Sequence, residues 1–184
     1  MKFSKISILI AAFNLLALSA CFASDHVDPE ERIKELGIKL YTATPPTANY
    51  IKAVRSGNTL YLAGHIPQRE DGTIITGKVG KDLTVEQGNA AARVVAINLI
   101  STLKNELGDL NHVVKIIKIF GMVNAVDTFV DHPKVINGAS DLLVSVFGEN
   151  RGKHTRSAVG MSSLPFGMAA EVEMVVEVDD TKTR

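Results

Sequence analysis

The sequence predicts an α+β protein in which a mixed β-sheet carries two main helices on one face. Stretches rich in Val and Ile, or alternating between apolar and polar residues, are typical of strands, and two longer stretches repeat apolar residues at helical spacing. Their order along the chain is hairpin, helix, strand, helix, hairpin. The chain has 184 residues, of which 46% are hydrophobic, so it can form the core of one domain.

The first 24 residues are typical of an export signal and not of the fold. Lys2 and Lys5 precede a largely apolar run, residues 6–20, which is too short to span a membrane comfortably. The alternative is a hydrophobic helix that belongs to the core. We expect an exported, periplasmic protein with no membrane span after processing.

Two processing sites remain open at the end of this signal. Leu18-Ser19-Ala20-Cys21 matches the bacterial lipoprotein box, in which residues 1–20 are removed and Cys21 is lipidated. Cys21-Phe22-Ala23 instead matches a small-x-small cleavage site that would release a soluble protein. Cys21 is the only cysteine, so we expect no intramolecular disulfide in the mature chain.

Residues 25–49 are expected to form a short helix and a connector. Asp28 suits the N-cap of this helix, Pro29 its first turn and Gly37 its end. A hairpin follows, with strands over 50–55 and 59–63 and a Ser-Gly-Asn turn between them.

The two main helices enclose one long strand. The first helix, 84–107, starts with a capping box formed by Thr84 and Gln87. Residues 113–126 are rich in Val and Ile and predict a central strand. The second helix runs over 133–147, between a proline and a glycine stop.

The last structured segment, residues 154–178, contains two strand-like runs joined by a Pro- and Gly-containing turn, and a polar tail, 180–184, follows. If the runs pair as a hairpin, Arg156 comes within reach of the strand that carries Glu171. A cation and a carboxylate on one pocket wall could bind a carboxylate ligand and position a water. The alternative is a surface ion pair worth under about 1 kcal/mol.

The charge balance argues against a broad nucleic-acid-binding surface, although a local basic patch could form on folding or assembly. Lys plus Arg equals Asp plus Glu at 20 each, and the sequence has no Lys/Arg-rich block. Nucleic-acid affinity depends on many cations that neutralise phosphates. We therefore expect no nucleic-acid partner.

The C-terminal segment resembles the closing part of the YjgF/RidA family, members of which are also named endoribonuclease L-PSP. The family pattern is an arginine, a small residue, Leu-Pro and a Val/Ile-Glu strand. The matching residues are Arg156, Ser157, Leu164, Pro165, Glu171 and Val172. The resemblance covers residues 50–179 and implies a chorismate mutase-like fold and a homotrimer with a barrel-like centre. It places three sites in clefts between the subunits.

The resemblance also assigns residues to this site. Arg156 would hold a substrate carboxylate, and Glu171 would orient a water or assist proton transfer. The other substrate-binding positions are Tyr50, Ala63, Gly64, His65 and Asn137. Three positions depart from the family pattern: Ala63 replaces a serine, His65, which could titrate near neutral pH, replaces a glutamine, and Ala158 occupies the place of a cysteine.

The resemblance implies hydrolysis of reactive enamines and imines of the 2-aminoacrylate type to 2-oxo acids and ammonia. This reaction requires no metal or cofactor, because the imine is already electrophilic. The alternative is a non-catalytic trimer that binds a small carboxylate or another metabolite. Ribonuclease activity, which the older family name implies, is less well supported because the sequence shows no histidine pair or basic groove.

Overall fold

A computed structural model describes residues 27–41 and 48–179. The predicted export signal with Cys21, part of the connector after the first helix, and the tail 180–184 lie outside the described residues. None of the helices in the described ranges combines the length and hydrophobicity needed to cross a bilayer.

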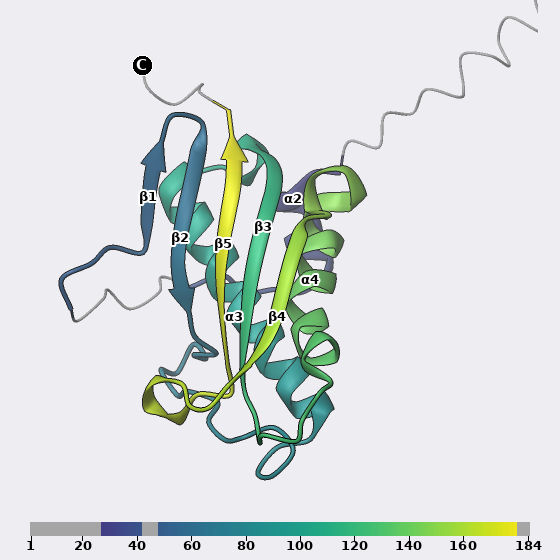
Figure 1. Ribbon diagram of the computed structural model, residues 1–184. Helices are drawn as coiled ribbons and strands as arrows, with labels where there is room; N and C mark the ends of the chain where they lie inside the picture. Colours follow the sequence, from purple (N-terminus) through teal and green to yellow (C-terminus); the bar gives the residue numbers. More distant parts are fainter. Residues whose placement is uncertain (1–26, 42–47, 180–184) are drawn as a thin grey trace, which may run out of the picture.

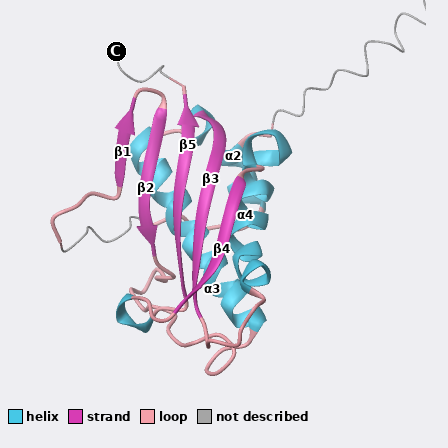
Figure 2. Cartoon of the chain, viewed as in Figure 1, coloured by secondary structure: helices cyan, strands magenta, loops and turns pink. Residues whose placement is uncertain are grey.

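The described chain forms a five-stranded sheet with its main helices on one face, which we call the helix-covered face (Figures 1 and 2). The elements are α2 (Pro29–Glu35), β1 (Ala53–Ser56), β2 (Thr59–His65), α3 (Val85–Leu107), η2 (Leu110–His112), β3 (Val113–Asn124), α4 (His132–Gly152), β4 (Thr155–Met161), η3 (Pro165–Gly167) and β5 (Ala170–Val178). The strand order is β1-β2-β5-β3-β4, and β3 and β4 are parallel whereas the other neighbours are antiparallel. The predicted α+β class with a mixed sheet is confirmed.

The ends of the helices follow the predicted local signals. Asp28 caps α2, and Thr84 forms the capping box that begins α3. Gly108 ends α3 in a left-handed conformation, with φ 72°. The predicted stop of α4 at Gly148 is only partly right, because the chain turns there with φ 75° and then continues in a further helical turn to Gly152.

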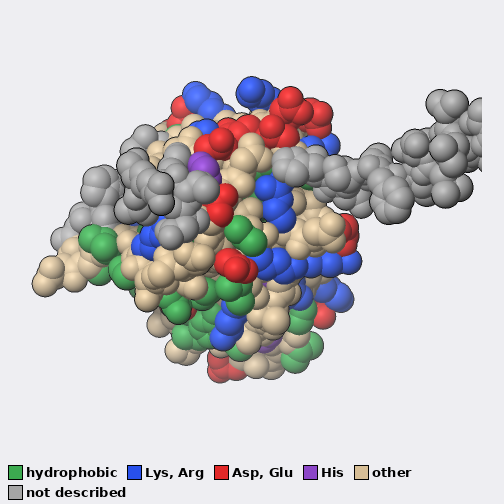
Figure 3. All heavy atoms as spheres, turned by 90° about the horizontal axis from the view of Figure 1, so that it is seen from above, with side chains coloured by type: hydrophobic (Ala, Val, Ile, Leu, Met, Phe, Trp, Pro, Cys, Tyr) green, Lys and Arg blue, Asp and Glu red, His purple; other side chains and the backbone are tan. Residues whose placement is uncertain are grey.

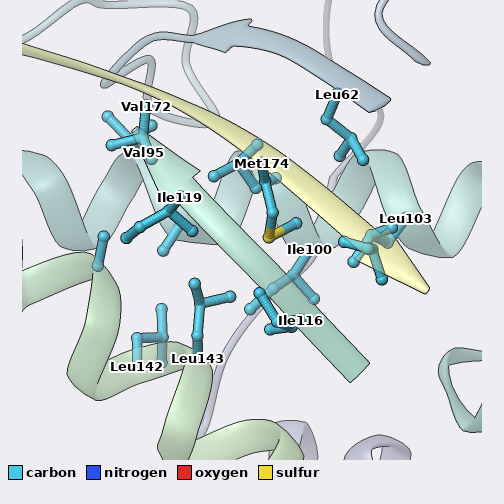
Figure 4. Packing of buried hydrophobic residues seen from close by; sticks show 14 of the residues in the cluster. Leu62, Val95, Ile100, Leu103, Ile116, Ile119, Leu142, Leu143, Val172 and Met174 are labelled. Atoms are coloured by element: carbon cyan, nitrogen blue, oxygen red, sulfur yellow. The ribbon is translucent and has the colours of Figure 1, made fainter. Parts of the chain in front are cut away.

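The core lies between the sheet and the two long helices (Figure 4). Every second residue of β5 is buried, from Val172 to Val178, and faces β3 residues such as Ile119 and α3 residues such as Ile100. Burial of one such aliphatic side chain stabilises the fold by about 1.5–3 kcal/mol. The core therefore fixes which face of each strand points towards the helices.

The predicted pairing of the two C-terminal strands is wrong. Strand β4 pairs with β3 alone, and β5 lies between β2 and β3. The reason is that β5 buries a fully apolar face and gains a hydrogen-bonded neighbour on each side in the centre of the sheet, whereas β4 is only half-buried and suits an edge. The β3–α4–β4 segment thus forms a parallel crossover at the edge.

On the other face of the sheet, which we call the open face, the described residues pack no helix along the strands (Figures 1 and 2). It carries a smaller apolar cluster around Met122, Leu164 and Met168, and exposed side chains that include Tyr61 and Val54. A hollow of about 430 Å³ lies over β1, β2, β3 and β5 on this face. Two helices cover only one face of the sheet, as the sequence predicted.

Candidate functional site

Arg156 and Glu171 lie on opposite faces of the sheet. Arg156 is paired with Ile119 across β4 and β3, and Ile119 is paired with Met174 of β5. Ile119 and Met174 are buried under the helices, and directly paired residues share a face, so Arg156 is on the helix-covered side. Glu171 is three residues from Met174 along β5 and points to the open face. The prediction that both line one pocket wall within a protomer is wrong, because it depended on the β4–β5 hairpin.

Strand β4 and helix α4 bring Arg156 and Asn137 together. The Nη1 of Arg156 donates to Oδ1 of Asn137 at 2.8 Å and to Oγ of Ser140 at 3.0 Å. Asn137 and Ser140 are three residues apart on α4 and therefore lie on the same side of that helix. Two of the predicted site residues thus form a direct contact, and Ser140 joins them.

The guanidinium of Arg156 has no carboxylate partner among the described residues. Both of its acceptors, Asn137 and Ser140, are uncharged, and no ion pair of the described chain includes it. The side chain is only partly buried at the sheet edge. Arginine donates in a planar fork that matches a carboxylate with two parallel hydrogen bonds. The edge between β4 and α4 can therefore bind an anion.

His154 is a further polar residue of this edge that the sequence analysis did not assign to the site. Its Nδ1 lies 2.6 Å from the carbonyl oxygen of Gly152, and its Nε2 lies 3.1 Å from Oγ of Ser140. Burial lowers the pKa of His154, and the positive charges of Arg156 and Lys115 lower it further, while the Gly152 carbonyl has the opposite effect. Two sequence signals could have found the pair: His154 stands two residues before Arg156, and Ser140 stands one helical turn after Asn137.

Gly64 and Glu171 form a second part of the predicted site, next to the open face. A Cβ atom at Gly64 would lie 1.9 Å from Oε1 of Glu171, so only a glycine lets this carboxylate lie against the backbone of β2. Burial raises the pKa of Glu171, and the charge of nearby Glu173 raises it further. A carboxyl group whose pKa is raised towards neutrality is better suited to proton transfer.

Ala63 lies with this second part, and Tyr50 lies near the β1 edge; neither lies with Arg156. Ala63 lines the open-face hollow together with Tyr61. Tyr50 precedes β1 and is 55% exposed. Strands β1 and β4 are the two edges of the sheet (Figure 1). Tyr50 precedes β1 and Arg156 belongs to β4, so they lie near opposite edges of one protomer.

The side chain of His65 belongs to the core interface between β2 and α3. It is 3% exposed, with Nδ1 2.7 Å from the carbonyl of Ala63 and Nε2 2.8 Å from Oγ1 of Thr102. A bulge between Leu62 and His65 adds one residue to β2 and turns the ring to the helix-covered side. Burial lowers its pKa to about 4. The prediction that His65 titrates near neutral pH is therefore wrong, and its side chain faces the core between β2 and α3.

This buried histidine predicts a specific loss of stability in acid. Its pKa falls from 6.5 to about 4 on folding, so the unfolded chain binds the proton more tightly. Its contribution is complete above pH 6.5 and is lost as the pH falls towards 4, by up to about 3 kcal/mol. We expect the difference in unfolding free energy between wild type and His65→Gln, measured by urea titration, to shrink over this range. An equal difference at pH 7 and pH 4.5 would contradict a neutral buried ring.

The predicted residues fall into two groups that a single protomer does not unite. One group, Arg156 and Asn137, lies at the β4 edge, and the other, Tyr50, Ala63, Gly64 and Glu171, lies on the open face and towards the β1 edge. Among residues 27–41 and 48–179, no group of three or more His, Cys, Asp or Glu side chains could hold a metal ion. The two groups that could take part in chemistry are therefore the guanidinium of Arg156, whose Nε and Nη2 have no acceptor among the described residues, and the carboxyl group of Glu171, whose pKa is raised.

Comparison with known proteins identifies the family of this arrangement. Residues 30–178 match the family described as "YjgF/chorismate mutase-like, putative endoribonuclease". The chain belongs to the YjgF/chorismate mutase-like family. The match begins within α2 and ends with β5, so this YjgF-family domain includes almost all of the described residues.

Several relatives share this YjgF-family domain over most of their length. Protein TCP17 of Trypanosoma cruzi is 44% identical over 148 residues, which are 80% of this chain and 92% of the relative. The crystal structure of Atu1372 from Agrobacterium tumefaciens, a protein of unknown function, is 44% identical with a TM-score of 0.76 and covers 82% of this chain and 92% of its own. The crystal structure of a "putative endoribonuclease" from Shewanella oneidensis MR-1 is 32% identical with a TM-score of 0.79. The match covers 82% of this chain and 99% of the Shewanella chain.

Proposed function

We propose that this YjgF-family protein hydrolyses reactive enamines and imines of the 2-aminoacrylate type to 2-oxo acids and ammonia. The observation that carries the proposal is the guanidinium of Arg156, which is held by two uncharged acceptors and has no carboxylate partner among the described residues. The carboxylate of the substrate supplies the missing counter-charge. Binding it in two parallel hydrogen bonds fixes the adjacent imine carbon in one position.

The reaction needs a water and proton transfers. The enamine takes a proton on carbon to give the imine, water adds to the C=N bond, and loss of ammonia gives the 2-oxo acid. Glu171 suits these transfers because its pKa is raised by burial and by Glu173. In this proposal Arg156 orients the substrate, and Glu171 orients the water and moves the protons.

The two residues can meet only if different copies of the chain contribute them. Oligomeric assembly is known for the family. We propose a homotrimer in which open faces turn inward and the β4 edge of one protomer, with Arg156, meets the Gly64–Glu171 region of a neighbour. Apolar side chains exposed on the open face, such as Tyr61 and Val54, then become buried. Sedimentation should give three times the mass of the mature chain, and a monomer would remove the shared cleft.

The decisive assay generates 2-aminoacrylate in solution and follows release of the 2-oxo acid. We expect the purified protein to accelerate this release above the spontaneous rate. A protein whose activity is lost on addition of metal chelators would contradict the mechanism. The Arg156 variants considered in the Discussion show whether any acceleration arises in this cleft.

A second candidate function is a non-catalytic trimer that binds a small carboxylate or another metabolite. It is favoured by Ala63 and Ala158, which leave neither a hydroxyl nor a thiol at those positions. No acceleration by the wild type, together with saturable binding of pyruvate that Arg156→Ala abolishes, would support this function. Endoribonuclease activity is less well supported, because Lys plus Arg equals Asp plus Glu at 20 each. On the surface seen in Figure 3, basic and acidic side chains are mixed and do not form a purely basic patch.

We also propose, from the sequence alone, that the protein is exported to the periplasm. Residues 1–24 are the proposed signal, with lipidation of Cys21 and release of a soluble form as the two routes. Mass spectrometry of the membrane fraction distinguishes them. An acyl mass on Cys21 supports the lipid anchor, and a mature protein that starts at Ser24 without an acyl mass contradicts it.

A further inference from the structure

A chain of three hydrogen bonds connects the backbone of α4 to the guanidinium of Arg156. It starts at the carbonyl of Gly152, 2.6 Å from Nδ1 of His154. A carbonyl can only accept, so Nδ1 carries a hydrogen. In the neutral ring Nε2 is then an acceptor, and Oγ of Ser140, 3.1 Å away, donates to it. The same hydroxyl oxygen accepts from Nη1 of Arg156 at 3.0 Å.

We call these three hydrogen bonds the relay. In the relay, His154 donates to Gly152 and accepts from Ser140, and Ser140 accepts from Arg156. This arrangement requires a neutral His154, because an imidazolium has no acceptor. The charged groups that face the ring are Arg156 on β4 and Lys115 on β3, and both are cations. Helix α4 contributes the hydroxyl of Ser140 and the carbonyl of Gly152, which are uncharged. This environment holds the ring in its neutral form.

The relay also determines which edge of the guanidinium faces a ligand. The two hydrogens of Nη1 are taken by Asn137 and Ser140. Neither Nε nor Nη2 of Arg156 has an acceptor among the described residues. These two nitrogens form the edge of the fork that binds a carboxylate with parallel hydrogen bonds.

We propose that Ser140 and His154 are positioning residues of this site, which hold Arg156 so that its Nε and Nη2 face the carboxylate of the ligand. The inference deepens the proposed function and rests on Arg156 as the carboxylate-binding group. Nothing in it requires either residue to touch the substrate. Ser140 acts directly on the guanidinium, and His154 acts through Ser140.

The first test reads the ring of His154 directly, by nitrogen-15 NMR of the full-length mature protein. We expect a neutral ring with the hydrogen on Nδ1 at pH 7, and a pKa of His154 that rises in Arg156→Met. A hydrogen on Nε2, or a charged ring at pH 7, would overturn the relay. The ligand-free spectra test the relay even if pyruvate does not bind, which would count against the proposed function instead.

The second test compares two serines of the same helix. We expect Ser140→Ala to raise the KM for the enamine, or the Kd for pyruvate, about tenfold, since a hydrogen bond to a charged group is lost. The kcat should change by less than about twofold, because bound substrate sits on the same fork. Ser145→Ala is the matched control, since its hydroxyl donates to the carbonyl of Asp141, one turn back on α4. Equal KM or Kd values for Ser140→Ala and wild type would overturn the proposal.

Variants of His154 separate positioning from folding. Glutamine can place an acceptor near the position of Nε2, so His154→Gln should keep the wild-type Kd, whereas His154→Leu should match Ser140→Ala. The double variant Ser140→Ala/His154→Leu should be no weaker than either single variant, because both changes break one relay. Additive losses, or a His154→Gln variant as weak as His154→Leu, would show that His154 does not act through Ser140.

Discussion

Replacing Arg156 with alanine should lower kcat/KM for the enamine by at least about 100-fold, because two charge-assisted hydrogen bonds to the substrate carboxylate are lost. The change leaves the fold intact, since Arg156 lies at the edge strand and is only partly buried. The measurement is 2-oxo acid release in the coupled assay, with the melting temperature recorded in parallel. An Arg156→Ala variant with full activity would show that the β4 edge is not the site.

Two further variants show which property of Arg156 matters. Arg156→Lys keeps the charge but not the planar fork, so we expect it to fall between wild type and Arg156→Ala. Arg55→Ala removes the same positive charge at the β1 edge, where the side chain donates to exposed backbone carbonyls. It should keep full activity. If Arg55→Ala is as impaired as Arg156→Ala, the loss reflects net charge and not a binding site.

Most of the fold was accessible from the sequence because its signals are local. The capping box at Thr84 and the left-handed Gly108 fix the two ends of α3 within a few residues. The alternation of β5 identifies its buried face. The order of the strands in the sheet could not be predicted in the same way. Whether β5 pairs with β4 or lies between β2 and β3 depends on how much apolar surface each arrangement buries across the whole sheet. A turn with Pro and Gly is equally compatible with a hairpin and with the connection observed here.

The candidate site shows the same division between local and long-range information. Asn137 and Arg156 were both assigned to the site by the resemblance, and the structure shows that they are hydrogen-bonded to each other. The prediction for His65 failed because one extra residue in the β2 bulge turns its side chain to the helix-covered face. The alternation of apolar and polar residues in the sequence does not show where such a bulge occurs. Ser140 and His154 were missed because neither is unusual in its own segment. Their role comes from the contact between α4 and β4.

That contact depends on how closely α4 packs against α3, and Gly138 tests this packing. A Cβ atom there would lie 2.0 Å from the backbone oxygen of Asn89 on α3 and 2.9 Å from its carbonyl carbon. A backbone atom cannot turn aside as a side chain can, so the two helices must separate. We expect Gly138→Ala to destabilise the protein by about 3 kcal/mol, at the upper end of the usual cost of overpacking.

The sign of this effect is informative because helix propensity alone predicts the opposite. Alanine in a helix is favoured over glycine by roughly 0.5–1 kcal/mol, so without a clash Gly138→Ala would stabilise α4. Gly88→Ala in α3 is the matched control: its nearest neighbours are side-chain methyl groups of Val79 and Val135, at 3.0 Å and beyond, which can adjust. Urea unfolding at one fixed protein concentration compares the two, because the stability of an oligomer depends on concentration.

The same substitution should reach the site, since Gly138 stands next to Asn137 on α4. Moving α4 away from α3 shifts Asn137 and Ser140 together, and the guanidinium of Arg156 then loses both of its acceptors. We expect the folded fraction of Gly138→Ala to bind pyruvate more weakly than either wild type or Gly88→Ala. A variant that is destabilised but binds pyruvate normally would show that Arg156 is positioned without α4. A variant as stable as wild type would show that the two helices do not touch at Asn89.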